Sequence, residues 1–126
     1  MSKILVVEDD QDIRDLLVDP LSDLGYDVVE AADGESGFQY ALEEHPDIIL
    51  LDVIMPIMDG FEVLQELKSN PSTSAALVIL VSTKGQEQDF NTAMNAGAWN
   101  HIVKPWEQED LEAKVMAAAG KPQKAA

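Results

Sequence analysis

The stretch DIILLDVIMPIMDG, from Asp47 to Gly60, decides how the rest of this sequence is interpreted. It opens with four aliphatic residues, 48–51, which is typical of a strand buried on both faces of a parallel sheet. The apolar run stops at Asp52, and in an open α/β sheet ligands collect where the strands end. Asp59 is placed to cap a following helix. The stretch therefore predicts a buried strand that ends in a carboxylate, although Asp52 alone could be a simple strand terminator.

The rest of the chain repeats this alternation of a short apolar run and a helical pattern. The other predicted strands are Lys3–Val7, Asp27–Ala31, Leu77–Val81 and His101–Val103. The predicted helices lie between Asp10 and Gly25, then over Glu35–Glu44, Asp59–Ser69, Gln86–Asn95 and Glu107–Ala119. Such alternation predicts an α/β fold with a five-stranded parallel sheet and helices on both faces. With five strands, we expect the flavodoxin-like order 2-1-3-4-5.

One residue conflicts with the first predicted helix. Pro20 lies inside its apolar pattern, where a proline removes an amide donor and crowds the carbonyl of Leu16, at a typical cost of about 3 kcal/mol. Because the apolar period continues on both sides, we predict a kink or a break between Leu16 and Pro20 rather than a different fold.

Length and composition limit the classes of function. The 126 residues are enough for one domain, which we place at residues 1–120, with 121–126 as a tail or linker remnant. The absence of cysteine excludes disulfides and thiolate metal sites. No apolar run reaches the length of a membrane span and no signal peptide is evident, so we expect a cytoplasmic protein. The formal charge of −16 argues against direct nucleic-acid binding.

The predicted strand order brings several polar residues together. Strands one and three would be neighbours, so Glu8, Asp9 and Asp52 would converge at one edge of the sheet. Ser82 and Lys104, which follow the fourth and fifth strands, would flank them. Taken singly, each residue has an ordinary explanation, such as a helix cap or a solvated side chain. Their shared position at the strand ends is what favours a site.

This set of residues indicates a chemistry. Clustered carboxylates either raise a pKa or bind a cation, and an oxygen-only donor set favours a hard ion such as Mg²⁺. An aspartate beside Mg²⁺ can attack a phosphoryl group, with the metal offsetting the charge that develops. Lys104 would pair with the phosphoryl oxygens and Ser82 would donate a hydroxyl hydrogen bond.

The segments ILVVEDD, LLDVIMPIMDG, LVSTK and HIVKPW together resemble the receiver domain of a two-component response regulator, and of the chemotaxis-regulator-like, stand-alone kind. The resemblance covers roughly residues 3–119. It implies that Asp52 is the phosphoacceptor. It also implies that Glu8 and Asp9 hold Mg²⁺ together with Asp52 and the backbone carbonyl of Ile54.

The resemblance assigns further roles around the phosphoacceptor. Ser82 would be the switch hydroxyl, Lys104 the phosphate-pairing lysine, and the bond before Pro105 a cis peptide. His101 departs from the family pattern, which commonly has Tyr or Phe at the position whose side chain turns inward. We therefore hypothesise that activation is pH-sensitive, or else that His101 is only a surface residue. Trp106 is expected in the core.

The implied function is signalling rather than enzymatic turnover. The domain would accept a phosphoryl group from a histidine kinase or histidine phosphotransfer protein, assist its own phosphorylation and dephosphorylation, and present a changed face to a downstream target protein. That face would comprise the fourth predicted helix, the fifth strand and the fifth helix. The cognate kinase, the target and the oligomeric state are left open.

Three alternatives remain. A magnesium-dependent phosphohydrolase would commonly place a second Asp two residues after the nucleophile, where this chain has Ile54. A flavin-binding domain would need a Ser/Thr/Gly-rich phosphate loop after the first strand, where the chain has acids instead. A protein-binding module that is never phosphorylated would not need the complete set of site residues.

Overall fold

The computed structural model describes residues 2–55, 57–83 and 94–120. Its elements are β1 (Lys3–Val7), α1 (Gln11–Asp23), β2 (Asp27–Ala31), α2 (Gly34–Glu44), β3 (Ile48–Asp52), α3 (Gly60–Ser69), β4 (Leu77–Thr83), β5 (Asn100–Lys104) and α5 (Gln108–Ala119). Residues 86–93 of the predicted fourth helix and the predicted tail, 121–126, lie outside the described residues. No helix in the described part of the chain has the length and apolar character needed to cross a membrane.

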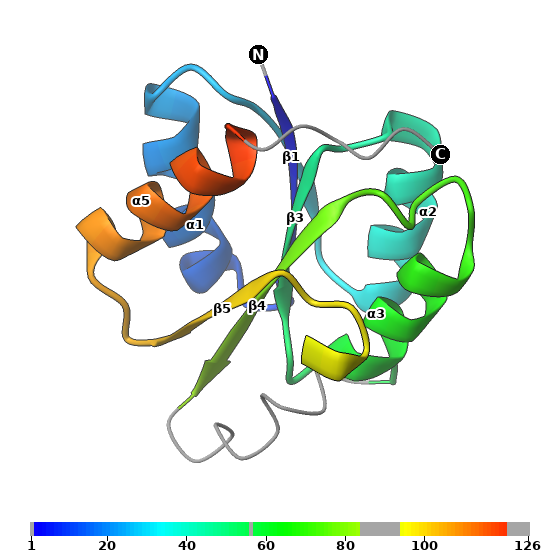
Figure 1. Ribbon diagram of the computed structural model, residues 1–126. Coiled ribbons are helices and arrows are strands. Elements are labelled where there is room, and N and C mark those ends of the chain that lie inside the picture. The colour runs from blue at the N-terminus through cyan, green and yellow to red at the C-terminus, as the bar shows by residue number, and fades with distance from the viewer. Residues whose placement is uncertain (1, 56, 84–93, 121–126) are drawn as a thin grey trace.

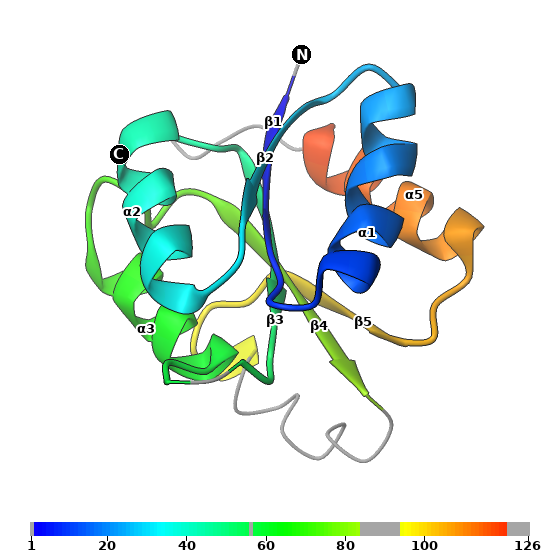
Figure 2. The same cartoon turned by 180° about the vertical axis from the view of Figure 1, so that it is seen from behind.

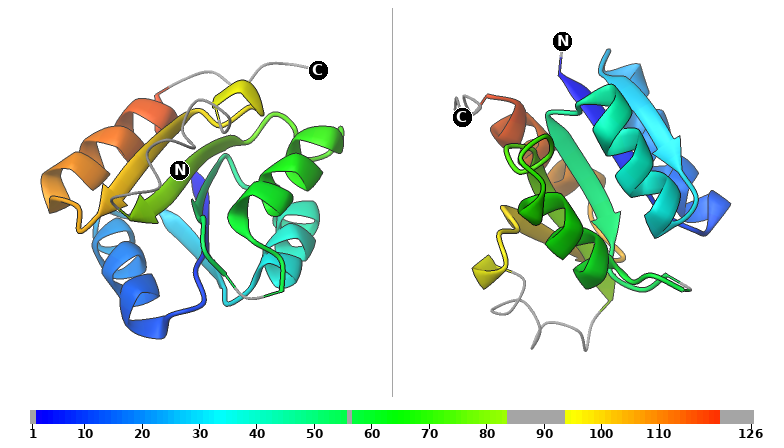
Figure 3. Two further views of the ribbon diagram at one scale, coloured as in Figure 1. Left: turned by 90° about the horizontal axis from the view of Figure 1, so that it is seen from below. Right: turned by 90° about the vertical axis from the view of Figure 1, so that its right-hand side faces the viewer.

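The five strands form one parallel sheet in the order β2-β1-β3-β4-β5, which confirms the predicted topology. Helices α1 and α5 cover one face, and α2 and α3 cover the other, so the molecule has three layers (Figures 1 and 2). The strand order places β1 beside β3, and their carboxyl ends lie at the same edge of the sheet. That edge is viewed from below in the left panel of Figure 3.

The core lies on both faces of the sheet because the central strands are apolar at successive positions. All five residues of β3 are buried. In β1, Ile4 and Val6 pack in the cluster that includes α1 and α5, whereas Leu5 and Val7 pack with α2 and α3. Trp106 is half-buried and packs against the α1–α5 cluster. The uninterrupted apolar run of a doubly covered strand thus has partners for every side chain.

Two strands extend further than the sequence pattern predicted. β4 continues through Ser82 to Thr83, and β5 reaches Lys104. The predicted ends were wrong because they followed the change from apolar to polar side chains, whereas pairing depends on the backbone. Ser82 pairs with Val103 and Thr83 with Lys104. The two strands therefore carry their polar residues to the very edge of the sheet.

Helix α1 is continuous through Pro20, so the break we considered does not occur. The Asp10 carboxylate caps the helix by accepting hydrogen bonds from the amides of Asp12 and Ile13 at 2.9 and 3.1 Å. Pro20 leaves the Leu16 carbonyl without its helical donor. Leu16 is 61% exposed, so water can solvate this part of the helix.

Candidate functional site

Three carboxylates meet where β1 and β3 end. Val7 pairs with Leu51 in the parallel ladder, so the residues that follow, Glu8 and Asp52, are neighbours. Glu8, Asp9 and Asp52 each place a carboxylate oxygen within 4.8 Å of the others. Glu8 and Asp52 are buried, whereas Asp9 is exposed. The structure therefore brings these three predicted site residues into one acidic cluster that is open on one side.

Lys104 reaches the same cluster from β5. Its ammonium nitrogen lies 3.3 Å from Glu8 Oε1 and 3.2 Å from Asp52 Oδ1. The side chain is 17% exposed, so both ion pairs are largely shielded from solvent. The Lys104–Pro105 peptide bond is cis. Within the described residues, one positive charge thus faces two buried carboxylates, so these residues alone leave the site short of positive charge.

This shortage changes the proton affinity of Glu8. Burial is the largest cause that raises the pKa of Glu8, the neighbouring Asp52 carboxylate adds to it, and Lys104 acts in the opposite direction, with the pKa reaching about 8. Without an additional cation, Glu8 favours its protonated form at neutral pH. A divalent cation at the same place would remove the need for that proton.

Two buried polar atoms at this edge have no hydrogen-bond partner among the described residues: Glu8 Oε2 and Ser82 Oγ. Ser82 is 2% exposed and follows Val81, which pairs with Asp52 in the sheet. Native proteins rarely leave such atoms unsatisfied unless a ligand, ion or water completes the site. Oxygen donors, excess negative charge and an unused carboxylate oxygen fit a hard divalent ion such as Mg²⁺.

Ile54 lies in the loop after β3, and His101 lies within β5. The amide of Ile54 lies 3.4 Å from Asp52 Oδ1, and its side chain is 61% exposed. His101 is half-buried in β5, where it pairs with Leu80, and its carbonyl accepts a hydrogen bond from Lys114 Nζ at 2.9 Å. His101 is not part of the described group of residues that could share a metal ion.

Arg14 is a structural partner of the site that the sequence analysis missed. Its Nη1 donates to the backbone carbonyl of Glu8 at 2.7 Å, and its Nε pairs with Glu30 Oε1 at 3.1 Å. The arginine therefore ties α1 to the residue that follows β1 and holds the acidic loop in place. Arg14 is the only arginine in the chain, and it lies near the start of a predicted helix that follows a run of acidic residues. This feature of the sequence could have indicated a role for Arg14 at the site.

Gly60 allows α3 to begin directly against the end of β3. Its amide donates to the Val53 carbonyl at 2.8 Å, and an added Cβ would lie 2.7 Å from Val53 Cα and would also meet the Asp52 carbonyl oxygen. Asp59 and Glu62 form a capping box at the same helix end. The loop after Asp52 is therefore closed at its base by backbone contacts.

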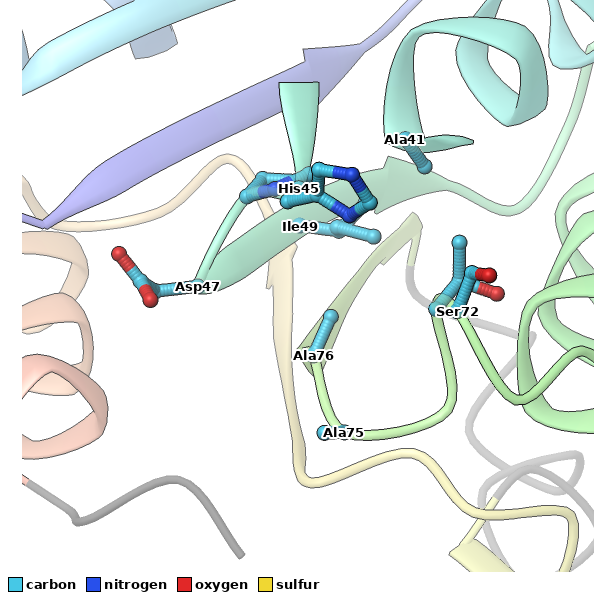
Figure 4. Close-up of a pocket in the computed structure, with 9 residues that line it drawn as sticks. Ala41, His45, Asp47, Ile49, Ser72, Ala75 and Ala76 are labelled. Atoms are coloured by element: carbon cyan, nitrogen blue, oxygen red, sulfur yellow. The ribbon is translucent and has the colours of Figure 1, made fainter. Parts of the chain in front are cut away.

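A separate cavity of about 180 Å³ lies at the opposite edge of the sheet, near the start of β3 (Figure 4). Its lining includes His45, Asp47, Ile49 and Thr73. Asp47 Oδ2 accepts a hydrogen bond from the Lys3 amide, and Thr73 Oγ1 donates to the Leu67 carbonyl. Because these polar groups are used within the chain, we assign the chemistry to the acidic cluster and not to this cavity.

Comparison with known sequences identifies a family model and several relatives that resemble this chain. Residues 4–116 match the family model described as the response regulator receiver domain. The chain is 38% identical over 123 residues to a probable transcriptional regulator, ycf27, of Porphyridium aerugineum, covering 98% of this chain and 50% of that protein. It is 36% identical over 111 residues to protein PilH of Pseudomonas aeruginosa, covering 88% of this chain and 92% of PilH. The chain thus spans about half the length of the first of these relatives and nearly all of the second.

Solved structures of receiver domains share this architecture. The chemotaxis protein CheY4 of Vibrio cholerae superposes with a TM-score of 0.88 at 30% identity, covering 94% of this chain and 98% of that one. The receiver domain of the sensor histidine kinase PA1611 of Pseudomonas aeruginosa gives a TM-score of 0.86 at 25% identity, covering 95% and 98%. That structure has a magnesium ion coordinated in its active-site cleft. With the family model covering most of its length, the chain belongs to the response regulator receiver domain family.

Proposed function

We propose that this receiver domain accepts a phosphoryl group on Asp52 in a Mg²⁺-dependent reaction and thereby switches a protein-binding face. The donor would be a histidine kinase or a histidine phosphotransfer protein. The observation that carries the proposal is the position of Asp52, which ends β3 with Oδ1 3.2 Å from Lys104 Nζ and shares its pocket with two other acids.

The transfer step follows from these positions. An oxygen of the Asp52 carboxylate attacks phosphorus, the new O–P bond forms, and the N–P bond of the donor phosphohistidine breaks. The imidazole leaves with the electron pair of that bond and takes up a proton. Lys104 pairs with the phosphoryl oxygens, and the unused hydroxyl of Ser82 donates a hydrogen bond to them.

The metal ligands in this proposal are Glu8, Asp9, Asp52 and the backbone carbonyl of Ile54. Bound Mg²⁺ would supply the positive charge that offsets the phosphoryl oxygens and the clustered carboxylates. Arg14 positions this set indirectly, through its hydrogen bond to the Glu8 carbonyl.

Phosphorylation would be transmitted through Ser82 and β5. Once Ser82 donates to the phosphoryl group, the end of β4 is drawn toward Asp52, which biases the face formed by residues 86–95, β5 and α5. His101 lies in β5 and would give this switch a dependence on pH, with weaker or stronger target binding as its ring titrates. The output would be contact with a downstream target protein, in the cytoplasm.

The direct test is phosphorylation by acetyl phosphate, followed by intact mass. We expect the wild-type protein to gain one phosphoryl group with Mg²⁺ and none without it. Asp52→Asn should gain none, while Asp59→Asn, which retains a capping side chain, should behave as wild type. A gain without Mg²⁺, or an equal gain in Asp52→Asn, would contradict the proposal. Turnover of unrelated phosphate esters would instead support a phosphohydrolase.

A further inference from the structure

The strand β5 is held at two points by contacts with side chains outside its own pairing with β4. In the described sheet, β5 is an edge strand with β4 as its neighbour. At its end, Lys104 binds the Asp52 and Glu8 carboxylates at 3.2 and 3.3 Å. Near its start, the His101 carbonyl accepts a hydrogen bond from Lys114 Nζ of α5 at 2.9 Å. β5 therefore connects the proposed phosphoacceptor site to α5.

The contact between Lys114 and His101 has an ordinary explanation at the edge of a sheet. The His101 amide donates to the side-chain oxygen of Asn100 at 2.8 Å, so side chains take up both backbone groups of this residue. Lysine side chains and covering helices commonly protect edge strands from pairing with another chain. Protection alone would not depend on the state of the phosphoacceptor, and this difference makes a second role testable.

Lys114 extends from a firmly packed helix. Leu111 and Val115 of α5 are fully buried and pack in the same cluster as Ile102 of β5. The Lys114 ammonium also pairs with Asp110 Oδ2, one turn earlier in α5, at 3.1 Å, and the lysine side chain is 25% exposed. A hydrogen bond from a charged donor is stronger than one between neutral groups. Lys114 thus links β5 to a helix that does not itself belong to the acidic cluster.

Phosphorylation of Asp52 changes the forces on β5. Under the proposed function, Lys104 exchanges its two carboxylate partners for phosphoryl oxygens, and Ser82 of the neighbouring strand turns to the same group. A hydrogen bond weakens steeply once its donor and acceptor separate or lose their alignment. A shift of β5 toward Asp52 therefore costs the contact between Lys114 and the His101 carbonyl.

We propose that Lys114 is a positioning residue that holds β5 in its unphosphorylated position through the His101 carbonyl. The inference rests on the proposed function, since it names a regulator of that same site. A contact made in one state alone opposes every ligand that selects the other state. Lys114 thus sets how strongly the domain resists activation, and it does so from α5 rather than from the acidic cluster.

Beryllofluoride, an analogue of the phosphoryl group, measures this resistance as a dissociation constant in calorimetric titrations with Mg²⁺. Lys114→Met removes the ammonium and keeps a long side chain. Its dissociation constant for beryllofluoride should fall by about threefold to tenfold, the factor that one hydrogen bond commonly contributes. Lys114→Arg retains a charged donor and should restore the wild-type value. Asp110→Asn removes the partner that orients Lys114 and should give a smaller fall.

Lys3→Met is the matched control. It makes the same change in net charge, but Lys3 pairs with Glu44 and Asp27 at the other end of β1 from Glu8. Its dissociation constant for beryllofluoride should equal that of the wild-type protein.

The ¹³C resonance of the His101 carbonyl reports the contact itself, because its chemical shift depends on the hydrogen bond that the carbonyl accepts. In the wild-type protein, beryllofluoride should move this resonance toward its position in ligand-free Lys114→Met. In Lys114→Met, the resonance should move much less.

Several results would overturn the inference. Equal beryllofluoride affinity of wild type and Lys114→Met would mean that the contact persists in both states, as a purely structural contact does. Weaker binding by Lys114→Met would mean that the contact supports the activated state. An equal gain in Lys3→Met would assign the effect to net charge, and a gain confined to concentrations at which sedimentation shows self-association would place Lys114 between two copies. Absence of beryllofluoride binding by the wild-type protein is visible without any substitution, and would overturn the proposed function along with this inference.

Discussion

At the scale of single residues, Glu8 has a conflict between burial and charge. It is almost fully buried, it lies beside the Asp52 carboxylate, and its cationic partner Lys104 is shared with Asp52. The pKa of Glu8 is therefore raised to about 8. The folded state holds a proton on Glu8 that the unfolded chain would already have released.

This raised pKa predicts how pH and Mg²⁺ act on the protein. Mg²⁺ binds the deprotonated carboxylate, so protons compete with Mg²⁺ below about pH 8. As the pH rises to about 8, the apparent Mg²⁺ dissociation constant should fall by up to about tenfold per pH unit. Without metal, the folded state binds more protons than the unfolded state, so the free energy of unfolding should decrease as the pH rises from about 5 to about 8. Calorimetric titration measures the Mg²⁺ dissociation constant, and urea unfolding measures the free energy of unfolding.

Substitution of Glu8 supplies the control for this prediction. Glu8→Gln cannot titrate, so the decrease in unfolding free energy over that pH range should largely disappear. Glu35→Gln changes an exposed acid and should keep the wild-type slope. An unchanged slope in Glu8→Gln would show that another group holds the proton.

At the scale of elements, the packing of α3 against β3 depends on Gly60. An added Cβ would meet the backbone of Asp52 and Val53, and backbone atoms at the base of a closed loop cannot move away cheaply. Gly60→Ala should lower the free energy of unfolding by about 1–3 kcal/mol. Urea unfolding tests this.

Gly120 gives the matched comparison for Gly60→Ala. It ends α5 with φ of −79°, and the nearest atom to an added Cβ is the Met116 carbonyl oxygen at 3.5 Å, an ordinary contact. Gly120→Ala should change stability by less than about 1 kcal/mol. Equal effects of the two substitutions would mean that the close approach at Gly60 is relieved at little cost.

Pro20 is the second element-scale case, because α1 contains it without interruption. Pro20→Ala restores the amide that can donate to the Leu16 carbonyl, so the free energy of unfolding should rise by about 1–3 kcal/mol. The gain is reduced by the stabilisation that the proline provides when it restricts the unfolded chain. Pro71→Ala, at an exposed turn before β4, should give no such gain. Lower stability of Pro20→Ala in thermal or urea unfolding would mean that the proline suits its place in the helix.

At the scale of the whole molecule, the topology followed from the sequence because short apolar runs alternate with helical patterns, and the runs of the central strands are apolar at successive positions. The same reasoning placed Glu8, Asp9 and Asp52 at a common edge, since the order of the strands determines which strand ends meet. Side-chain polarity was a poor guide to where β4 and β5 end, because backbone pairing continues through Ser82 and Lys104.

Other features could not be predicted because they depend on how loops fold back on the sheet. The hydrogen bond from Arg14 to the Glu8 carbonyl joins a helix to a loop, and no periodicity reports it. The left-handed conformation of Ile57 contradicts the preference of its residue type. Local rules commonly fail at functional positions, and Ile57 lies in the loop that follows the proposed phosphoacceptor.

The most direct test of the central claim is a crystal structure with Mg²⁺ and beryllofluoride, which forms a phosphoryl-like adduct on an aspartate. We predict one adduct, on Asp52, with Lys104 Nζ and Ser82 Oγ in contact with its fluorines and Mg²⁺ bound by Glu8, Asp9 and Asp52. An adduct on another carboxylate, or an adduct on Asp52 from which Lys104 and Ser82 turn away, would contradict the account.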